Sequence, residues 1–440
     1  MIKLDMDRID KVVNNLVHGI EHKIDDDWLP KLVGLKNRAK TAMANLEPLH
    51  FEQLKTMLTK AHDQAVAAMH SGAPPHPGEL PWELVHGLCT LDLLGGAKPL
   101  PKIYADFPTV VRADGTLLGC RQWELLDPRW NEALIEWLEH LMWRAEFGTT
   151  PAVLEIPDDV VLGIVGDWGT GLFATDCAAG KIAKLIAALK PDYTIHLGDV
   201  YYAGTQKDET NNMKAWPQGT RGSFNLNSNH EMYNGAFGYF SEIARSFPLQ
   251  NNTSYFALQN TNWLVIGLDS VYHSDRHNLY MNGKLDQGQI DWLAKLPKDG
   301  KKVLILSHHE AHSALGKDKT DLFQQVTAAL GSEPDYWYWG HLHNGIVYNP
   351  IGKFHGRCAG HGAIPYGNSI EMENDPTISW VETDLANDDT YPERVLNGYA
   401  VITLNGKEVS EKMMGEDGSV RWEASSKWYE GCPEKLHQPA

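Results

Sequence analysis

Residues 195–204 read Ile-His-Leu-Gly-Asp-Val-Tyr-Tyr-Ala-Gly, a short apolar run that ends in Gly-Asp and continues into a loop. A similar pattern lies upstream, where residues 160–169 read Val-Val-Leu-Gly-Ile-Val-Gly-Asp-Trp-Gly. The apolar spacing of residues 182–189 predicts an amphipathic helix between two buried strands. In such a β-α-β unit, ligands bind at the carboxyl ends of the strands. Asp167 and Asp199 therefore stand where half of a metal site is expected.

The chain on either side of this unit predicts two domains. Residues 1–150 carry apolar side chains at helical spacing and predict a mostly helical accessory or cap domain, followed by an α/β domain over residues 151–440. The polar residues 205–227, with scattered Gly and Asn, predict a long functional loop. Further strands are expected at residues 255–258, 263–268, 303–306 and 336–339, and residues 399–406 predict a closing antiparallel strand with an Asn-Gly turn.

Composition narrows the class of protein. The 440 residues carry a net charge of -18, which argues against a nucleic-acid-binding scaffold. No run of 18 or more apolar residues occurs, so no membrane span is expected. The first 20 residues lack the pattern of a secretory signal, and the five scattered cysteines without a CxxC pair favour free thiols in a reducing compartment. These features predict a cytoplasmic location.

Residues with metal-binding or catalytic chemistry stand directly after several of the apolar runs. They form five clusters: Gly166-Asp167, Gly198-Asp199, Asn229-His230-Glu231, His308-His309 and Gly340-His341-Leu342-His343. Taken one at a time, each has an ordinary alternative, such as a turn, a surface loop or a solvated pair of histidines. All five in this order, each after a β-like run, are hard to produce by chance.

The order of these clusters resembles the calcineurin-like metallophosphoesterases, and within them the purple acid phosphatases. The resemblance covers residues 160–362 and implies a four-layer α/β/β/α sandwich, here preceded by the helical domain. Most relatives have a histidine two residues after the first aspartate, where this chain has Gly169. Tyr202, three residues after Asp199, is the position from which the purple acid phosphatases supply a phenolate ligand. Alternatively, Tyr202 is a packed aromatic side chain.

The resemblance implies two metal ions bridged by Asp199. It assigns one ion to Asp167, Asp199, Tyr202 and His343, and the other to Asp199, Asn229, His308 and His341. Phenolate and carboxylate oxygens favour Fe(III), while imidazole and amide ligands suit a divalent ion such as Fe, Zn or Mn. Two ions about 3.5–4 Å apart activate a water as hydroxide and clamp a phosphoryl group.

Residues beside the metals are expected to complete the site. The resemblance makes His230 the proton donor to the leaving group, catalytic together with Asp199, and Glu231 is expected to orient His230. Three further histidines are candidates to line the pocket and to support the ligands or contact the substrate, although a solvated or backbone-bonded histidine is the stronger alternative for each: His309, His312 and His361. Ser228 stands where the family has glycine, which slightly weakens the assignment of Asn229.

The sequence therefore predicts a metallophosphoesterase that hydrolyses a small phosphorylated substrate. Monoesters are slightly favoured, and the alternative is a phosphodiesterase acting on nucleotides or lipid head groups. A metal-free scaffold with the same fold is a third hypothesis. Every ligand position is filled, which argues against the scaffold.

Overall fold

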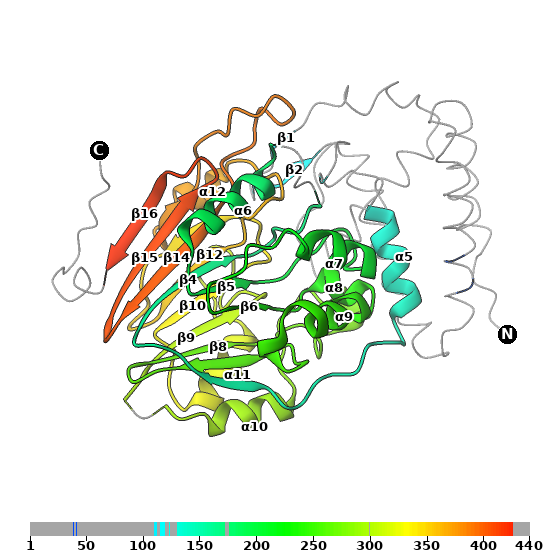
Figure 1. Cartoon of the computed structure of the whole chain (residues 1–440). Coiled ribbons are helices and arrows are strands. Elements are labelled where there is room, and N and C mark those ends of the chain that lie inside the picture. Colours follow the sequence, from blue (N-terminus) through cyan, green and yellow to red (C-terminus); the bar gives the residue numbers. More distant parts are fainter. Residues whose placement is uncertain are drawn as a thin grey trace, which may run out of the picture.

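Two β-sheets form the centre of the molecule (Figure 1). The computed structural model describes Arg38, Thr41 and residues 110–111, 115–118, 123, 130–171, 176–298 and 300–425. Within these residues one sheet has the strand order β16-β15-β14-β4-β5-β6, and the other has the order β13-β11-β12-β10-β9-β8-β7-β3.

The six-stranded sheet contains the β-α-β unit with the two aspartates. Its strands are β4 (Asp159–Val165), β5 (Tyr193–His196), β6 (Gly222–Asn225), β14 (Gly398–Asn405), β15 (Glu408–Gly415) and β16 (Val420–Ser425). β4, β5 and β6 run parallel, and α6 (Ala178–Leu189) connects β4 to β5. Parallel strands end at the same edge, so the loops after β4 and β5 lie side by side.

The eight-stranded sheet supplies the histidine-bearing loops. Its strands are β3 (Ala152–Glu155), β7 (Phe256–Gln259), β8 (Trp263–Gly267), β9 (Lys302–Ser307), β10 (Tyr336–Trp339), β11 (Gly345–Tyr348), β12 (His355–Ala359) and β13 (Ile378–Val381). β8, β9 and β10 are parallel neighbours. The loops after β9 and β10 therefore emerge at one edge of this sheet.

Three apolar cores separate four layers. Ile164 and Leu306 belong to the core between the two sheets. Leu293 and Val326 belong to the core under α10 (Gln287–Lys295) and α11 (Asp321–Leu330). Ile186 of α6 belongs to the third core, with α5 (Trp130–His140), α8 (Asn229–Tyr233) and α9 (Phe237–Ser246). In Figure 1, α10 and α11 lie on the opposite side of the sheets from α6. The α/β/β/α prediction is confirmed.

The predicted strands of the α/β domain are confirmed within one or two residues, but residues 205–227 are not a continuous loop. They contain α7 (Gln206–Met213) and β6. Thr205 caps the start of α7 because its side chain accepts a hydrogen bond from the Asp208 backbone amide. The Asp208 side chain accepts one from the Thr205 backbone amide. Short helices α12 (Ile370–Glu373), η2 (Pro248–Gln250) and η3 (Arg276–Asn278) complete the described elements. No described helix has the length and apolarity needed to cross a membrane.

Part of the region before residue 150 contacts the loop after β12. β1 (Val110–Val111) pairs antiparallel with β2 (Leu117–Leu118). Thr116 forms a β-bridge with Tyr366, and the Gly367 amide donates to the Gly115 carbonyl at 2.7 Å. Most of the predicted helical domain lies outside the described residues.

Candidate metal centre

The candidate ligands lie in loops at the edges of both sheets. Asp167 follows β4 and Asp199 follows β5, while His308 follows β9 and His341 and His343 follow β10. Four of these residues have positive φ angles, 56° at Asp167, 75° at Asp199, 66° at His341 and 55° at His343. Such conformations are uncommon in non-glycine residues and concentrate at functional sites. Loops from both sheets therefore bring these side chains together at one place.

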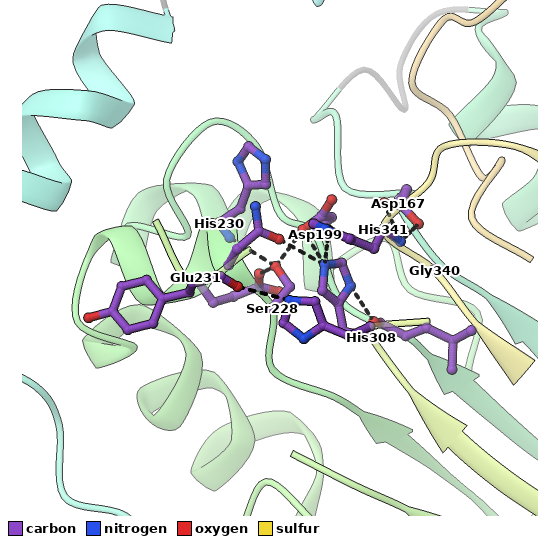
Figure 2. A network of polar contacts seen from close by, with 12 residues as sticks. Asp167, Asp199, Ser228, His230, Glu231, His308, Gly340 and His341 are labelled. Atoms are coloured by element: carbon purple, nitrogen blue, oxygen red, sulfur yellow. Dashed lines mark hydrogen bonds and ion pairs between the residues drawn. The ribbon is translucent and has the colours of Figure 1, made fainter. Parts of the chain in front are cut away.

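Two buried carboxylates and one imidazole form the core of the centre. Oxygen and nitrogen atoms of Asp167, Asp199 and His308 all lie within 4.8 Å of one another. His343 Nε2 lies 3.3 Å from Asp167 Oδ1 and 3.4 Å from Asp199 Oδ2. The backbone amide of His341 donates to Asp167 Oδ2 at 3.0 Å. Figure 2 shows Asp199 between Ser228 and Glu231 on one side and Asp167 and His341 on the other.

Lone pairs converge on the other side of Asp199. His308 Nδ1 donates to the Leu197 carbonyl at 3.0 Å, because a carbonyl can only accept. Burial lowers the pKa of His308 to about 4, so the ring is neutral at pH 7 and Nε2 carries a lone pair. That Nε2 lies 2.8 Å from Asn229 Oδ1 and 3.1 Å from His341 Nδ1.

Asn229 is oriented so that its oxygen faces this point. Its amide nitrogen donates to the Tyr233 hydroxyl at 3.0 Å. An amide oxygen and an imidazole lone pair therefore face each other at hydrogen-bond distance, with no proton available between them. A cation satisfies both, and nitrogen and oxygen donors of this kind are ordinary metal ligands. The side chains present thus fit the implied metals.

The pKa values of the two carboxylates are shifted in opposite directions. Burial and the neighbouring charge of Asp199 raise the pKa of Asp167 well above its usual range. Burial would also raise the pKa of Asp199, but the charges of His308 and His230 and the hydrogen bond from His343 hold it well below. Two aspartates buried side by side repel each other. Positive charge between them removes that cost.

Glycines give the ligands room. A Cβ at Gly340 would lie 2.6 Å from Asp167 Oδ2, and one at Gly360 would lie 2.7 Å from the same atom. A Cβ at Gly169 would lie 2.8 Å from the Asp199 carbonyl oxygen and 2.9 Å from Val200 Cα. Gly169 is locked there by hydrogen bonds to the Asp199 carbonyl and from the Tyr201 amide. A histidine at this position would therefore require this backbone to move.

The structure places Tyr201, the neighbour of the predicted ligand Tyr202, at the carboxylates. Tyr201, not Tyr202, supplies the hydroxyl that donates to Asp199 Oδ2 at 2.8 Å, and the same hydroxyl lies 2.9 Å from His343 Nε2. The Tyr202 ring instead stacks on Trp123 with the ring centroids 4.4 Å apart. The two tyrosines are adjacent, and only the course of the loop decides which one turns inward.

His230 is held beside the centre by a different partner than predicted. Its Nδ1 donates to the Tyr202 carbonyl at 2.7 Å. Glu231 contacts the Ser228 hydroxyl instead of His230, and the same hydroxyl contacts Asp199 Oδ1. Burial and the charge of Asp199 raise the pKa of Glu231 to about 8. In Figure 2 the His230 ring projects to one side of the cluster.

The remaining histidines differ in position. The His309 ring lies against His308 and His341, and its nitrogens contact the Ser270 hydroxyl and the Tyr280 carbonyl. His309 thus supports the ligands from behind. His312 packs on Trp339 and Tyr348, and His361 lies close to Gly345 and Gly398. Neither ring has a described contact with the proposed ligands.

Sequence reasoning missed the roles of Tyr201 and Ser228. Ser228 caps α8 by accepting from the His230 amide, and it also joins Asp199 to Glu231. A serine directly before a predicted loop ligand is a signal for helix capping. The second role depends on the approach of β5 to α8, which no local pattern contains.

Comparison with known proteins finds a family that matches the part of the chain carrying these loops. A family model described as calcineurin-like phosphoesterase matches residues 160–345. No curated protein matches the chain. A dimetal phosphatase from Danio rerio is 13% identical, with 60% of this chain and 98% of that chain covered and a TM-score of 0.42.

Two further solved structures are similarly distant. GAP50 of Plasmodium, an anchor in the inner membrane complex, is 12% identical over 60% of this chain and 88% of that chain, with a TM-score of 0.41. Vacuolar Protein Sorting 29 from Cryptosporidium parvum is 14% identical over 61% of this chain and 97% of that chain, with a TM-score of 0.32. The part of the chain that carries most of the candidate ligands, residues 160–345, therefore resembles the calcineurin-like phosphoesterase family, and it contributes strands to both sheets.

Proposed function

We propose that this protein hydrolyses phosphate esters, with a preference for monoesters, at a centre of two metal ions. The family match supports metal-dependent phosphoester hydrolysis. The observation that carries the proposal is the convergence of buried acceptors: two carboxylates, an amide oxygen and imidazole nitrogens meet, and no proton lies between Asn229 Oδ1 and His308 Nε2. Such an arrangement is costly to bury unless cations complete it.

The proposed ligand sets share Asp199. Asp167, Asp199 and His343, with a tyrosine hydroxyl, would hold one ion, for which Fe(III) is proposed. Asp199, Asn229, His308 and His341 would hold a divalent ion, Fe, Zn or Mn. When bound, such a pair lowers the pKa of water and neutralises charge on a phosphoryl group. The domain boundary near residue 150 is part of this proposal, because β3 begins at Ala152.

The protein's own groups would position substrate and handle protons. The Tyr202 carbonyl fixes the proton of His230 on Nδ1 and leaves Nε2 to exchange a proton with the leaving oxygen. Ser228 steadies Asp199 from behind, and His309 supports His308 and His341. This division keeps the ligands rigid while His230 stands to one side.

The test combines turnover with metal content. Release of phosphate from an aryl phosphate is measured on metal-loaded wild type, Asp199→Asn and His308→Ala, with Asp291→Asn as a matched change on exposed α10. Loss of one ligand is expected to reduce turnover about 10³-fold or more, together with bound metal, while the Asp291 variant stays at wild type.

Full turnover in either ligand variant would refute the assignment. A bis-aryl phosphate in the same assay decides the ester class, since faster release from the diester would overturn the monoester preference. Less than one metal per chain in carefully purified protein, with no turnover, would favour the scaffold hypothesis.

A further inference from the structure

A cavity of about 160 Å³ adjoins the metal centre. His341 and His343 line it, and the His343 side chain is 18% exposed, whereas those of Asp167 and His308 are fully buried. A substrate therefore reaches the centre on the histidine side, where the cavity lies. Whatever group leaves the phosphorus on this side occupies the cavity.

The walls of the cavity are apolar and aromatic. They include Leu117, Trp123, Trp130, Ile364, Tyr366 and Met372. No Lys, Arg, Asp or Glu is among the described residues that line it. Asn344 contributes an amide, whose nitrogen donates to the Leu342 carbonyl at 2.7 Å. The cavity thus offers contact area and little charge.

The walls are held in place before any ligand binds. Thr116 bridges to Tyr366, so the strand that carries Leu117 is fixed to the loop that carries Ile364. Trp123 stacks on Tyr202, and Trp130 meets the same ring edge-on at 4.8 Å. Leu117 and Met372 are 2% and 4% exposed. Fixed walls reduce the entropy lost on binding.

These walls are additions to the matched domain. Leu117, Trp123 and Trp130, and the lining residues of the segment 364–372, lie outside the residues 160–345 that match the family model, which contributes only the histidine side. Described residues that precede β3 therefore build one wall of the cavity beside the candidate ligands.

Size and chemistry define the ligand. A cavity of about 150 Å³ with apolar walls accommodates one benzene-sized ring. A second phosphate or a carboxylate would lose hydration here without a cationic partner, and sugar hydroxyls would find few hydrogen-bond partners. An uncharged aromatic ring fills the space and packs edge or face against the tryptophans.

We propose that this cavity is the leaving-group site and that it selects phosphomonoesters of aromatic or arylalkyl alcohols, with Leu117, Trp123 and Trp130 as specificity residues. The inference rests on the proposed function, because the phosphoryl group must lie at the metal centre. The bond broken is phosphorus–oxygen, water supplies the new oxygen, and the alcohol departs into the cavity with the proton.

Binding is tested first without turnover. Calorimetry on the metal-loaded full chain compares benzylphosphonate with methylphosphonate, which share the anionic group but differ by the ring. Benzylphosphonate is expected to bind roughly tenfold or more tightly, from the apolar area the ring buries. Equal affinities would overturn the proposal.

Turnover is then compared among primary alcohols of similar leaving ability. Benzyl phosphate is expected to exceed glycerol 3-phosphate and O-phosphoserine by roughly tenfold or more in kcat/KM, mainly through KM. Leu117→Ala and Met372→Ala are expected to remove most of this advantage while glycerol 3-phosphate hydrolysis changes little. Leu189→Ala, on exposed α6, is the matched control and keeps the preference.

The outcomes separate this inference from the function on which it rests. If no substrate releases phosphate and no ligand variant changes metal content, the proposed function fails. If all three substrates are hydrolysed equally, or both wall variants slow them equally, the function stands and the leaving-group site is wrong. Melting temperatures of the two wall variants show whether each is folded.

Discussion

Neighbouring tyrosines show what a single side chain adds to the centre. The Tyr201 hydroxyl donates to Asp199 and lies close to His343. The Tyr202 ring packs on Trp123, and the Tyr202 carbonyl accepts a hydrogen bond from His230. Both residues therefore touch the site, by different atoms. A hydroxyl at the carboxylates can become a metal-bound phenolate, whereas a carbonyl that holds a histidine sets its tautomer.

The ferric phenolate predicted from the sequence is best tested on both tyrosines. A ferric phenolate absorbs visible light by charge transfer, so iron-loaded protein is expected to be purple or pink. Tyr201→Phe is expected to abolish the band, because its hydroxyl is the one that reaches Asp199. Tyr202→Phe is the matched control, and loss of the band in that variant alone would restore the original assignment. The measurement is the visible spectrum at equal iron content.

The requirement for glycine beside Asp167 can also be tested at the scale of single residues. Gly340→Ala is expected to displace Asp167, because the new Cβ would lie 2.6 Å from Oδ2. We expect metal affinity to fall at least tenfold, measured by competition with a chelator. Gly352→Ala is the control: a Cβ there meets nothing within 4 Å, and its φ of 64°, unlike that of Gly340, lies in the left-handed region, so the control carries at least as much backbone strain. Equal metal affinities in both variants would contradict the steric argument.

Sequence alone predicted that most of the candidate ligands lie close together, because each follows a strand directly. Asp167, Asp199, His308 and His341 do converge in the structure. Tyr201 was missed because motif spacing counts residues, whereas the direction of a side chain in an irregular loop depends on backbone angles such as φ 75° at Asp199. Spacing therefore locates a ligand-bearing loop more reliably than it identifies the inward side chain.

At the scale of elements, α8 is a short helix whose start is fixed by its N-cap residue. It has only five residues, and Ser228 accepts from the His230 amide at its start. The same hydroxyl contacts Asp199 and Glu231. One serine thus fixes both the helix that carries Asn229 and the carboxylate that Asn229 faces.

Removal of this cap is expected to affect stability and metal binding together. Ser228→Ala should cost about 1–2 kcal/mol of unfolding free energy from the lost cap and the unpaired carboxylates. Metal affinity is expected to fall as well. Ser369→Ala, which removes the cap of α12, serves as the comparison and should lower stability without changing metal affinity. Chemical denaturation and chelator competition measure the two effects, and unchanged metal affinity in Ser228→Ala would count against the link to Asp199.

The region 205–227 shows why elements were missed. α7 reads Gln-Lys-Asp-Glu-Thr-Asn-Asn-Met and has almost no apolar periodicity, so its pattern is that of a loop. Its start depends on the capping box at Thr205, and Glu209 is buried through packing against other helices. Tertiary contacts override a weak local preference here.

On the scale of the whole molecule, several histidines are buried neutral within the layers. His361 is 1% exposed, and neither ring nitrogen has a hydrogen-bond partner among the described residues. Burial lowers its pKa to about 3. The unfolded chain, with a histidine pKa of about 6.5, binds a proton that the folded protein excludes.

Acid is therefore expected to destabilise the fold through this group. Between pH 6.5 and 3 the unfolded state carries more protons, so His361 lowers the unfolding free energy by up to about 1.4 kcal/mol for each unit of falling pH. Above pH 6.5 both states are neutral and the contribution vanishes. In His361→Gln, the unfolding free energy is expected to fall less between pH 7 and pH 5 than in wild type, by the contribution of one proton. Denaturation at the two pH values measures this difference. Parallel slopes for wild type and variant would contradict the assignment.

Gly169 also constrains how such a centre can change over generations. Its backbone fills the room beside Asp199 and Val200 that a larger residue would need. A histidine introduced there by one codon change would meet the neighbouring chain before it met a metal. A site with histidine at position 169 and a site with glycine there and a tyrosine after Asp199 therefore need different backbone turns. A variant that carries only one of these two changes would be disfavoured. Exchanging the whole segment 166–171 together with residues 199–202 is the smallest graft that this geometry permits.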